Sequence, residues 1–120
     1  AFQLIDDILG ITGDAAVTGK SASSDVRAGK RSAPIVAALD AGTDAAARLA
    51  RVFTDAPLVA EDDVALAAKL IEEAGGLAWA ADEADRCLAR ALVHLDALDA
   101  PPEAVAELVE LARYVVERDL

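Results

Sequence analysis

The apolar residues recur three to four positions apart through most of the chain, and proline or glycine separates one such segment from the next. This spacing puts the apolar side chains on one face of an α-helix, whereas a strand would require alternation. Alanine and leucine, which favour helices, are abundant, and the aromatic residues are only two Phe, one Trp and one Tyr. We therefore predict an all-α fold, a helical bundle whose antiparallel neighbours are joined by short turns.

The capping and breaking residues divide the periodic pattern into separate helices. Pro34 suits a first helical turn, Thr43 suits an N-cap, and Gly75 with Gly76 indicates a helix end. The predicted helices cover residues 1–11, 34–39, 45–53, 61–74, 77–98 and 105–116. Residues 12–32 lack apolar periodicity and are rich in Gly, Ser, Thr, Asp and Lys, so they predict a long loop of the kind that is usually functional or disordered.

Size and charge narrow the classes of function. A chain of 120 residues and 12.3 kDa makes one domain at most. The formal net charge of −11 argues against a nucleic-acid partner and against an anionic membrane surface, because both attract basic patches. The single cysteine, Cys87, excludes an internal disulfide, and no apolar run is long enough for a membrane span. We expect a cytoplasmic protein. We also expect Trp79 to pack between helices, and Tyr114 to do the same with its hydroxyl at the surface.

The first residue is not Met, and the chain opens on helical periodicity with no capping residue before Phe2. We therefore expect a fragment, a processed product or the tail of a longer chain.

The opening segment "FQLIDDILGITGDAAVTGKS" allows two interpretations. A phosphate-binding P-loop needs four residues between its glycines before the Lys-Ser pair, whereas five separate Gly13 from Gly19, and the α/β pattern that surrounds a P-loop is missing. The alternative is a metal site. Asp6 and Asp7 offer hard oxygen ligands that suit Mg²⁺ together with substrate phosphates.

The cations of this acidic chain gather in one place. Between residues 20 and 31 the charged residues are Lys20, Arg27, Lys30 and Arg31, opposed by Asp25 alone. These cations could form the second half of a diphosphate clamp. An adjacent Asp pair is by itself most often a solvated helix face. The order of a carboxylate pair, a polar loop and an isolated cationic cluster favours the metal and diphosphate interpretation.

With those residues in place, the stretch "FQLIDDILGITGDAAVTGKSASSDVRAGKRSAPIVAAL" resembles the second aspartate-rich region of the trans-isoprenyl diphosphate synthases, the polyprenyl synthetase family. The residues in register with the family pattern are Phe2-Gln3, Asp6-Asp7, Gly13-Asp14, Gly19-Lys20, Asp25, Gly29-Lys30 and Pro34. The later helices are similar to the family's C-terminal region in a weaker way. The resemblance implies the C-terminal part of the isoprenoid synthase fold for residues 1–120, with a metal-binding helix end at 1–11, a diphosphate-binding loop at 12–32 and helices at 33–120.

The resemblance also implies roles for individual residues. Asp6 and, less directly, Asp7 would hold Mg²⁺ on the diphosphate of an allylic substrate. Lys20 and Lys30 would contact that diphosphate, and Asp25 would support the lysines or a metal-bound water. Gln3 would face the isoprenoid cavity near the reacting carbons, so that Lys20 and Gln3 are the expected catalytic residues.

The implied activity is a Mg²⁺-dependent condensation of an allylic diphosphate with isopentenyl diphosphate, which gives a longer trans-prenyl diphosphate. The implied partners are those two substrates, a second copy in a homodimer, and an upstream part of the protein or a partner chain, because the family's first aspartate-rich motif has no counterpart here. This chain alone is therefore expected to be inactive. Gly10 also departs from the pattern, since it replaces the third aspartate of the motif.

Two other functions fit parts of the sequence. A class I terpene cyclase would share the ionisation of an allylic diphosphate but not the condensation, and the lysine-bearing loop favours the transferase. A non-catalytic helical subunit or cargo domain, with Gly10 as the mark of a decayed site, is the second alternative. The retention of Asp6, Asp7, Lys20 and Lys30 argues against full decay.

Overall fold

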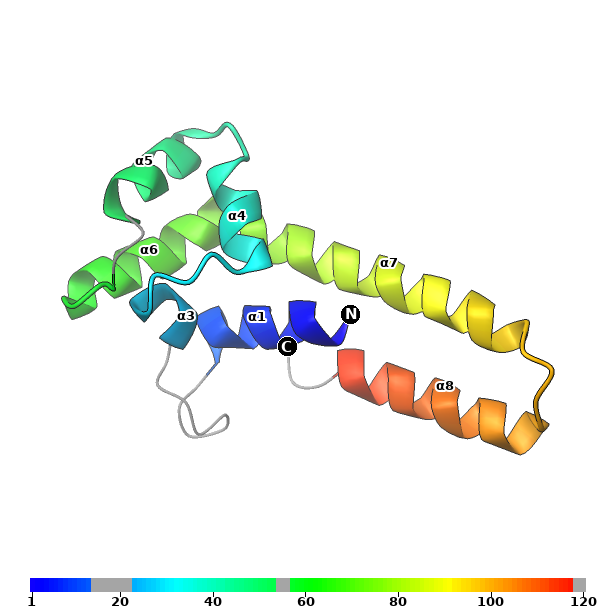
Figure 1. Cartoon of the computed structure of the whole chain (residues 1–120). Coiled ribbons are helices and arrows are strands. Elements are labelled where there is room, and N and C mark those ends of the chain that lie inside the picture. Colours follow the sequence, from blue (N-terminus) through cyan, green and yellow to red (C-terminus); the bar gives the residue numbers. More distant parts are fainter. Residues whose placement is uncertain (14–22, 54–56, 118–120) are drawn as a thin grey trace.

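A computed structural model of the chain describes residues 1–13, 23–53 and 57–117, and the regular structure within these ranges is entirely helical (Figure 1). The all-α prediction is therefore confirmed. The helices are α1 (Phe2–Thr12), α3 (Ser24–Arg27), α4 (Ala33–Leu39), α5 (Asp44–Val52), α6 (Glu61–Glu73), α7 (Gly76–Asp96) and α8 (Pro102–Val116).

The helix boundaries follow the signals in the sequence. Thr43 caps α5, because its Oγ1 accepts a hydrogen bond from the Ala46 backbone N–H at 3.1 Å. Gly75 separates α6 from α7 with φ at +85°, a conformation that glycine adopts without strain. Pro102 opens α8, where its missing N–H costs no helical hydrogen bond.

The predicted loop at 12–32 contains one turn of helix, α3, which the sequence did not indicate. Val26 is fully buried in this turn, and Gly29 follows it with φ at +66°. The Gly29 N–H donates to the Val26 carbonyl, and the Lys30 N–H donates to the Asp25 carbonyl at 2.9 Å. This bonding pattern is a Schellman motif, in which the left-handed glycine ends the helix and folds the chain back. Residues 14–22 of the predicted loop lie outside the described residues.

The core consists of two clusters. The first joins α3, α4, α5 and α6 around fully buried side chains such as Ile35, Leu49 and Leu70. The second joins α1, α7 and α8 around Ile5 and Ala84. Helix α1 packs on α7 in the second cluster and lies beside α3, which belongs to the first (Figure 1). It therefore connects the two clusters, and it carries the first residues of the site.

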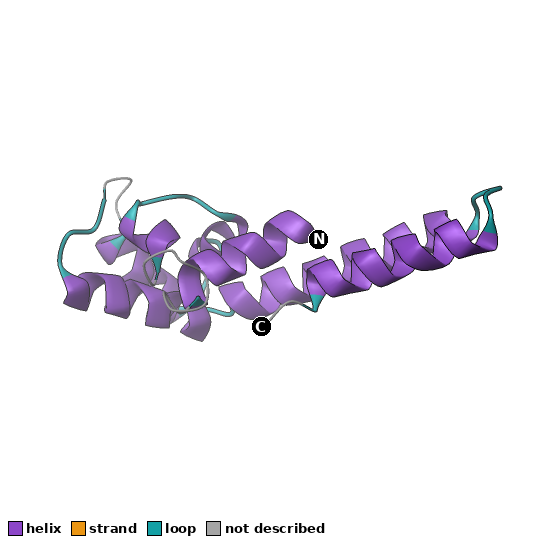
Figure 2. Ribbon diagram, turned by 90° about the horizontal axis from the view of Figure 1, so that it is seen from below, coloured by secondary structure: helices purple, strands orange, loops and turns teal. Residues whose placement is uncertain are grey.

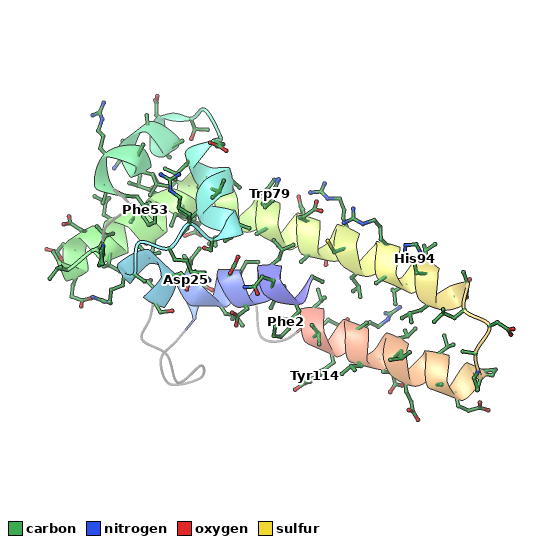
Figure 3. All side chains as sticks on the ribbon, in the orientation of Figure 1. Phe2, Asp25, Phe53, Trp79, His94 and Tyr114 are labelled. Carbon is green, nitrogen blue, oxygen red and sulfur yellow. The ribbon has the colours of Figure 1, made fainter. Side chains whose placement is uncertain are left out.

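The long helices α7 and α8 extend away from the other helices as an antiparallel hairpin, which Figures 1 and 2 show from two directions. The molecule is accordingly elongated, with principal extents of 53, 33 and 19 Å. Trp79 is 44% exposed and Tyr114 is 68% exposed, so the prediction that both pack between helices was wrong (Figure 3). Among the helices that the structure describes, none combines the length and apolar character needed to cross a membrane.

Candidate functional site

The site begins with a row of residues on one face of α1. Gln3, Asp7 and Gly10 are four and three residues apart, so they follow one another along the same side of the helix. The Gln3 side-chain amide donates a hydrogen bond from Nε2 to Asp7 Oδ1 at 2.9 Å. Asp7 is only 5% exposed, which is unusual for a carboxylate and implies that partners from other elements surround it.

One of those partners is the start of α4. The Ala33 backbone N–H, in the first turn of α4, donates to Asp7 Oδ2 at 3.2 Å. The preceding Ser32 makes no side-chain cap, so the carboxylate that meets this helix end comes from α1. A carboxylate at a helix N-terminus satisfies an otherwise unpaired N–H and interacts favourably with the helix dipole. Asp7 therefore fixes α4 to α1.

The second partner is Lys30, which the Schellman turn after α3 directs toward α1. Its Nζ donates to Asp25 Oδ2 at 2.7 Å and to Asp7 Oδ1 at 3.1 Å. The side chain of Lys30 is 47% exposed, whereas the carboxylates that hold it are nearly covered. Lys30 is thus held between a carboxylate from α1 and one from α3, and its ammonium remains partly open to solvent.

These contacts shift the pKa values of the pair in opposite directions. Burial by itself raises the pKa of the Asp7 carboxyl, but the hydrogen bonds from Gln3, Ala33 and Lys30 outweigh burial and hold the pKa below its ordinary value. The hydrogen bond to Asp25, with a further one to Asp7, raises the pKa of the Lys30 ammonium in spite of partial burial. Both groups are therefore charged at neutral pH.

Asp6 occupies a different side of α1, because consecutive residues of a helix are turned by about 100° from each other. Its side chain is half-buried. Across the described ranges, no three His, Cys, Asp or Glu side chains gather into a group that could hold a metal by themselves. Mg²⁺ is commonly bound through one or two carboxylates together with waters and substrate phosphates. The carboxylates of this helix have the donor chemistry for that ion.

The predicted site residues fall into three groups. Gln3, Asp7, Asp25 and Lys30 are joined in one hydrogen-bonded cluster, and Asp6 adjoins it on α1. Lys20 lies outside the described residues. Arg27, a member of the cationic cluster, donates instead to Glu61 on α6 at 2.7 Å and links α3 to α6.

The sequence did not reveal two backbone contributions to this site. The Ala33 N–H binds Asp7 across 26 positions of sequence, a partnership that only the packing of α4 on α1 creates. Ser23 Oγ donates to the Ile11 carbonyl at 2.9 Å and thereby ties the start of α3 to the end of α1. The serine-rich composition of the segment was visible, but the partner of this hydroxyl was not.

Comparison with known proteins places these features in a family. Residues 1–72 match the family model described as "Polyprenyl synthetase". The (2E,6E)-farnesyl diphosphate synthase of Mycobacterium tuberculosis is 38% identical over 121 residues, which cover 98% of this chain and 34% of the relative. The geranylgeranyl diphosphate synthase of the same organism is 35% identical over 120 residues, covering 99% of this chain and 33% of the relative.

A solved structure of a related protein supports the same family assignment. The crystal structure of a polyprenyl synthetase from Streptomyces coelicolor A3(2) superposes with a TM-score of 0.90 at 46% identity, covering 95% of this chain and 36% of that one. The chain thus spans about a third of the length of the relatives that it matches.

Proposed function

The chain belongs to the polyprenyl synthetase family, and from this premise we propose that it carries the second aspartate-rich half of a prenyltransferase active site. The reaction is the Mg²⁺-dependent condensation of an allylic diphosphate with isopentenyl diphosphate. In it the allylic C–O bond breaks, the double bond of isopentenyl diphosphate attacks the allylic carbon, and loss of a proton gives the longer prenyl diphosphate. The relatives in Mycobacterium tuberculosis, a farnesyl and a geranylgeranyl diphosphate synthase, support this substrate class.

The observation that carries the proposal is the placement of Lys30. A half-exposed ammonium held by Asp7 and Asp25 is a fixed positive charge beside the carboxylate pair of α1. Such a charge can bind a diphosphate without a search through side-chain conformations, and it stabilises the negative charge that develops as the diphosphate leaves. Lys20 would contribute a second cation of this kind.

The two aspartates of the pair have different roles in this proposal. Asp6 would hold Mg²⁺, and Asp7 would act mainly by fixing Lys30, Gln3 and the start of α4. When bound, Mg²⁺ would neutralise charge on the leaving diphosphate. Gln3, whose amide already donates to Asp7, would stand at the edge of the isoprenoid cavity close to the reacting carbons.

The remaining parts of the site would come from elsewhere. A geranylgeranyl pyrophosphate synthase structure from Corynebacterium glutamicum is described as complexed with isoprenyl diphosphate and magnesium, and this chain covers 33% of it at a TM-score of 0.85. We propose that an upstream part of the protein, or a partner chain, supplies the first aspartate-rich motif. Exposed apolar side chains on α7 and α8, among them Val93 and Leu111, support a partner that covers these helices. The homodimer and the cytoplasmic location are still predictions.

Calorimetric binding of geranyl diphosphate, with Mg²⁺ or with EDTA, tests this function. We expect binding only with Mg²⁺, and we expect Asp6→Asn, Lys20→Ala and Lys30→Ala each to weaken it by about 10–100-fold, the usual value of a lost charged contact. The matched controls are Asp62→Asn and Lys69→Ala, whose side chains are exposed on α6. Unchanged affinity in all three site variants would refute the proposal.

Product analysis separates the alternatives. A longer prenyl diphosphate that forms only with isopentenyl diphosphate identifies the transferase. A cyclic hydrocarbon that forms without it identifies a terpene cyclase. If the full-length protein binds no diphosphate and forms no product with or without isopentenyl diphosphate, it is a non-catalytic subunit.

A further inference from the structure

A groove runs between α7 and α8 along the part of the hairpin that extends away from the other helices. Its volume is about 610 Å³, and its walls include Leu88 and Leu95 on α7, Leu108 and Leu111 on α8, and Leu98 in the turn between the two helices. Three of these leucines are exposed: Leu98 by 52%, Leu108 by 46% and Leu111 by 58%. Neighbouring exposed apolar side chains of this kind mark a surface that another segment or partner covers.

The walls of the groove offer little to a charged ligand. Among the described residues that line it, only His94 and Cys87 carry a polar or ionisable group in the side chain, and none is lysine or arginine. Small-molecule sites combine apolar walls with several converging polar groups, and a diphosphate requires cations. The groove therefore suits the apolar face of a polypeptide better than it suits a substrate.

The end of the groove nearest α1 is lined by Ala1, the residue that precedes this helix. The Ala1 carbonyl accepts a helical hydrogen bond from the Ile5 N–H at 3.1 Å. Ala1 also packs against the core cluster of Ile5, Ile8 and Ala84, which joins α1 to α7 and α8. The surface on which α1 packs and the groove beyond Ala1 are thus continuous.

The direction of α1 leads along this surface. Helix α1 runs opposite to α7, and its N-terminal end stands beside the hairpin where the groove begins, as Figures 1 and 2 show from two directions. A helix rises about 1.5 Å per residue, so the distance from Leu88 to Leu98 corresponds to roughly ten residues of an adjacent helix. Ala1, Ile5 and Ile8 follow one another at helical spacing, and apolar residues that continued this spacing upstream would face the leucines of the groove.

We propose that the roughly ten residues that precede Ala1 in the longer protein continue α1 as one helix, and that this helix fills the groove between α7 and α8. The extended helix would complete a three-helix bundle with the hairpin and hold the start of α1, which carries Gln3 and Asp6, in place. A second copy of the chain suits the groove less well, because it would have to share the space at Ala1 with the residues joined to it.

This proposal rests on the proposed function in one respect, namely that an upstream part of the same protein exists. The chain spans about a third of the length of its relatives, which leaves ample length for such a helix.

Disulfide cross-linking in the full-length protein tests the occupant of the groove directly. All native cysteines, Cys87 included, are replaced by serine, Leu95→Cys places one thiol in the groove, and a second cysteine is introduced in turn at each of the roughly ten residues before Ala1. Because a disulfide requires Cα atoms within about 7 Å, we expect cross-links within one molecule at positions three to four residues apart. The matched control replaces Leu95→Cys by Val59→Cys, an 88% exposed position before α6, and should give no cross-link. No cross-link with Leu95→Cys, equal yields at all positions, or cross-links only between two copies would overturn the proposal.

Thermal unfolding of the full-length protein gives a second test. Leu111→Ala should lower the melting temperature by roughly 5 °C or more, because it truncates a leucine that the upstream helix covers. Val59→Ala should lower it by less than about 2 °C. Equally small changes in both variants would show that the groove stays open and would contradict the proposal. Neither measurement uses a diphosphate, so a protein that cross-links as expected but binds no geranyl diphosphate would refute the proposed function and leave the upstream helix in the groove.

Discussion

Replacing Asp7 by alanine is expected to destabilise the protein more than any exposed carboxylate substitution, because one buried side chain holds three neighbours. Asp7 accepts hydrogen bonds from Gln3 at 2.9 Å, from Lys30 at 3.1 Å and from the Ala33 N–H at 3.2 Å. With alanine at position 7, the Ala33 N–H at the start of α4 loses its side-chain partner from α1 and the Lys30 ammonium loses one of its two carboxylates.

The magnitude follows from the kind of each contact. A capping bond to a helix N-terminus is worth about 1 kcal/mol, and a neutral side-chain hydrogen bond such as that of Gln3 about 0.5–1.5 kcal/mol. The pair with Lys30 is discounted to about 0.5–1 kcal/mol because the lysine side chain is 47% exposed. Asp7→Ala should therefore cost about 2–4 kcal/mol. Asp7→Asn keeps one oxygen and the shape, and should cost roughly half as much.

Urea unfolding followed by circular dichroism measures these losses as changes in the free energy of unfolding. Asp85→Asn, at an exposed position of α7, is the control and should change that energy by less than about 0.5 kcal/mol. A loss below about 0.5 kcal/mol for Asp7→Ala would mean that these three hydrogen bonds do not stabilise the fold.

The remaining predictions concern pH and packing. Folding lowers the pKa of the Asp7 carboxyl below its ordinary value of 3.8. Between the folded and the unfolded pKa, the unfolded state therefore binds more protons than the folded state. The contribution of Asp7 to the free energy of unfolding is accordingly full above about pH 4 and is lost as the pH falls through the folded pKa. Unfolding curves of the unaltered protein and Asp7→Asn should therefore differ at neutral pH and converge in acid; a constant difference would contradict the assignment. At Gly76 an added Cβ would collide with the Pro34 carbonyl oxygen and lie 2.8 Å from Ala38 Cβ, so Gly76→Ala should destabilise the contact between α4 and α7 by about 1–3 kcal/mol in the same urea assay, and a gain in stability would refute this.

Much of the fold could be predicted because its signals are local. Helical periodicity located the longer helices to within a few residues, and Thr43 and Gly75 marked boundaries that the structure confirms. The one-turn helix α3 was missed because four residues contain too little periodicity to detect, and its single buried apolar residue, Val26, gave no pattern.

Only part of the site could be predicted from the sequence, because several of its contacts depend on how the helices pack together. The motif identified the residue types, and the structure brings Gln3, Asp7, Asp25 and Lys30 together. The closeness of Asp25 to α1, where a Cβ added to Gly10 would lie 2.7 Å from Asp25 Cγ, depends on how α3 packs against α1, so the sequence did not reveal it. Trp79 was misjudged for a related reason, since an aromatic residue on a helix does not reveal which face has a neighbour.

A chimera tests most directly whether these residues complete a prenyltransferase site. In it, this chain replaces the matched third of the Corynebacterium glutamicum geranylgeranyl pyrophosphate synthase, to which it is 34% identical, and the rate of Mg²⁺-dependent incorporation of isopentenyl diphosphate is measured. We expect the folded chimera to elongate an allylic diphosphate, and we expect Asp6→Asn within the transplanted residues to lower the rate by about 10–100-fold. A folded chimera that elongates the substrate equally well with and without the Asp6 carboxylate would contradict the proposed role of this chain.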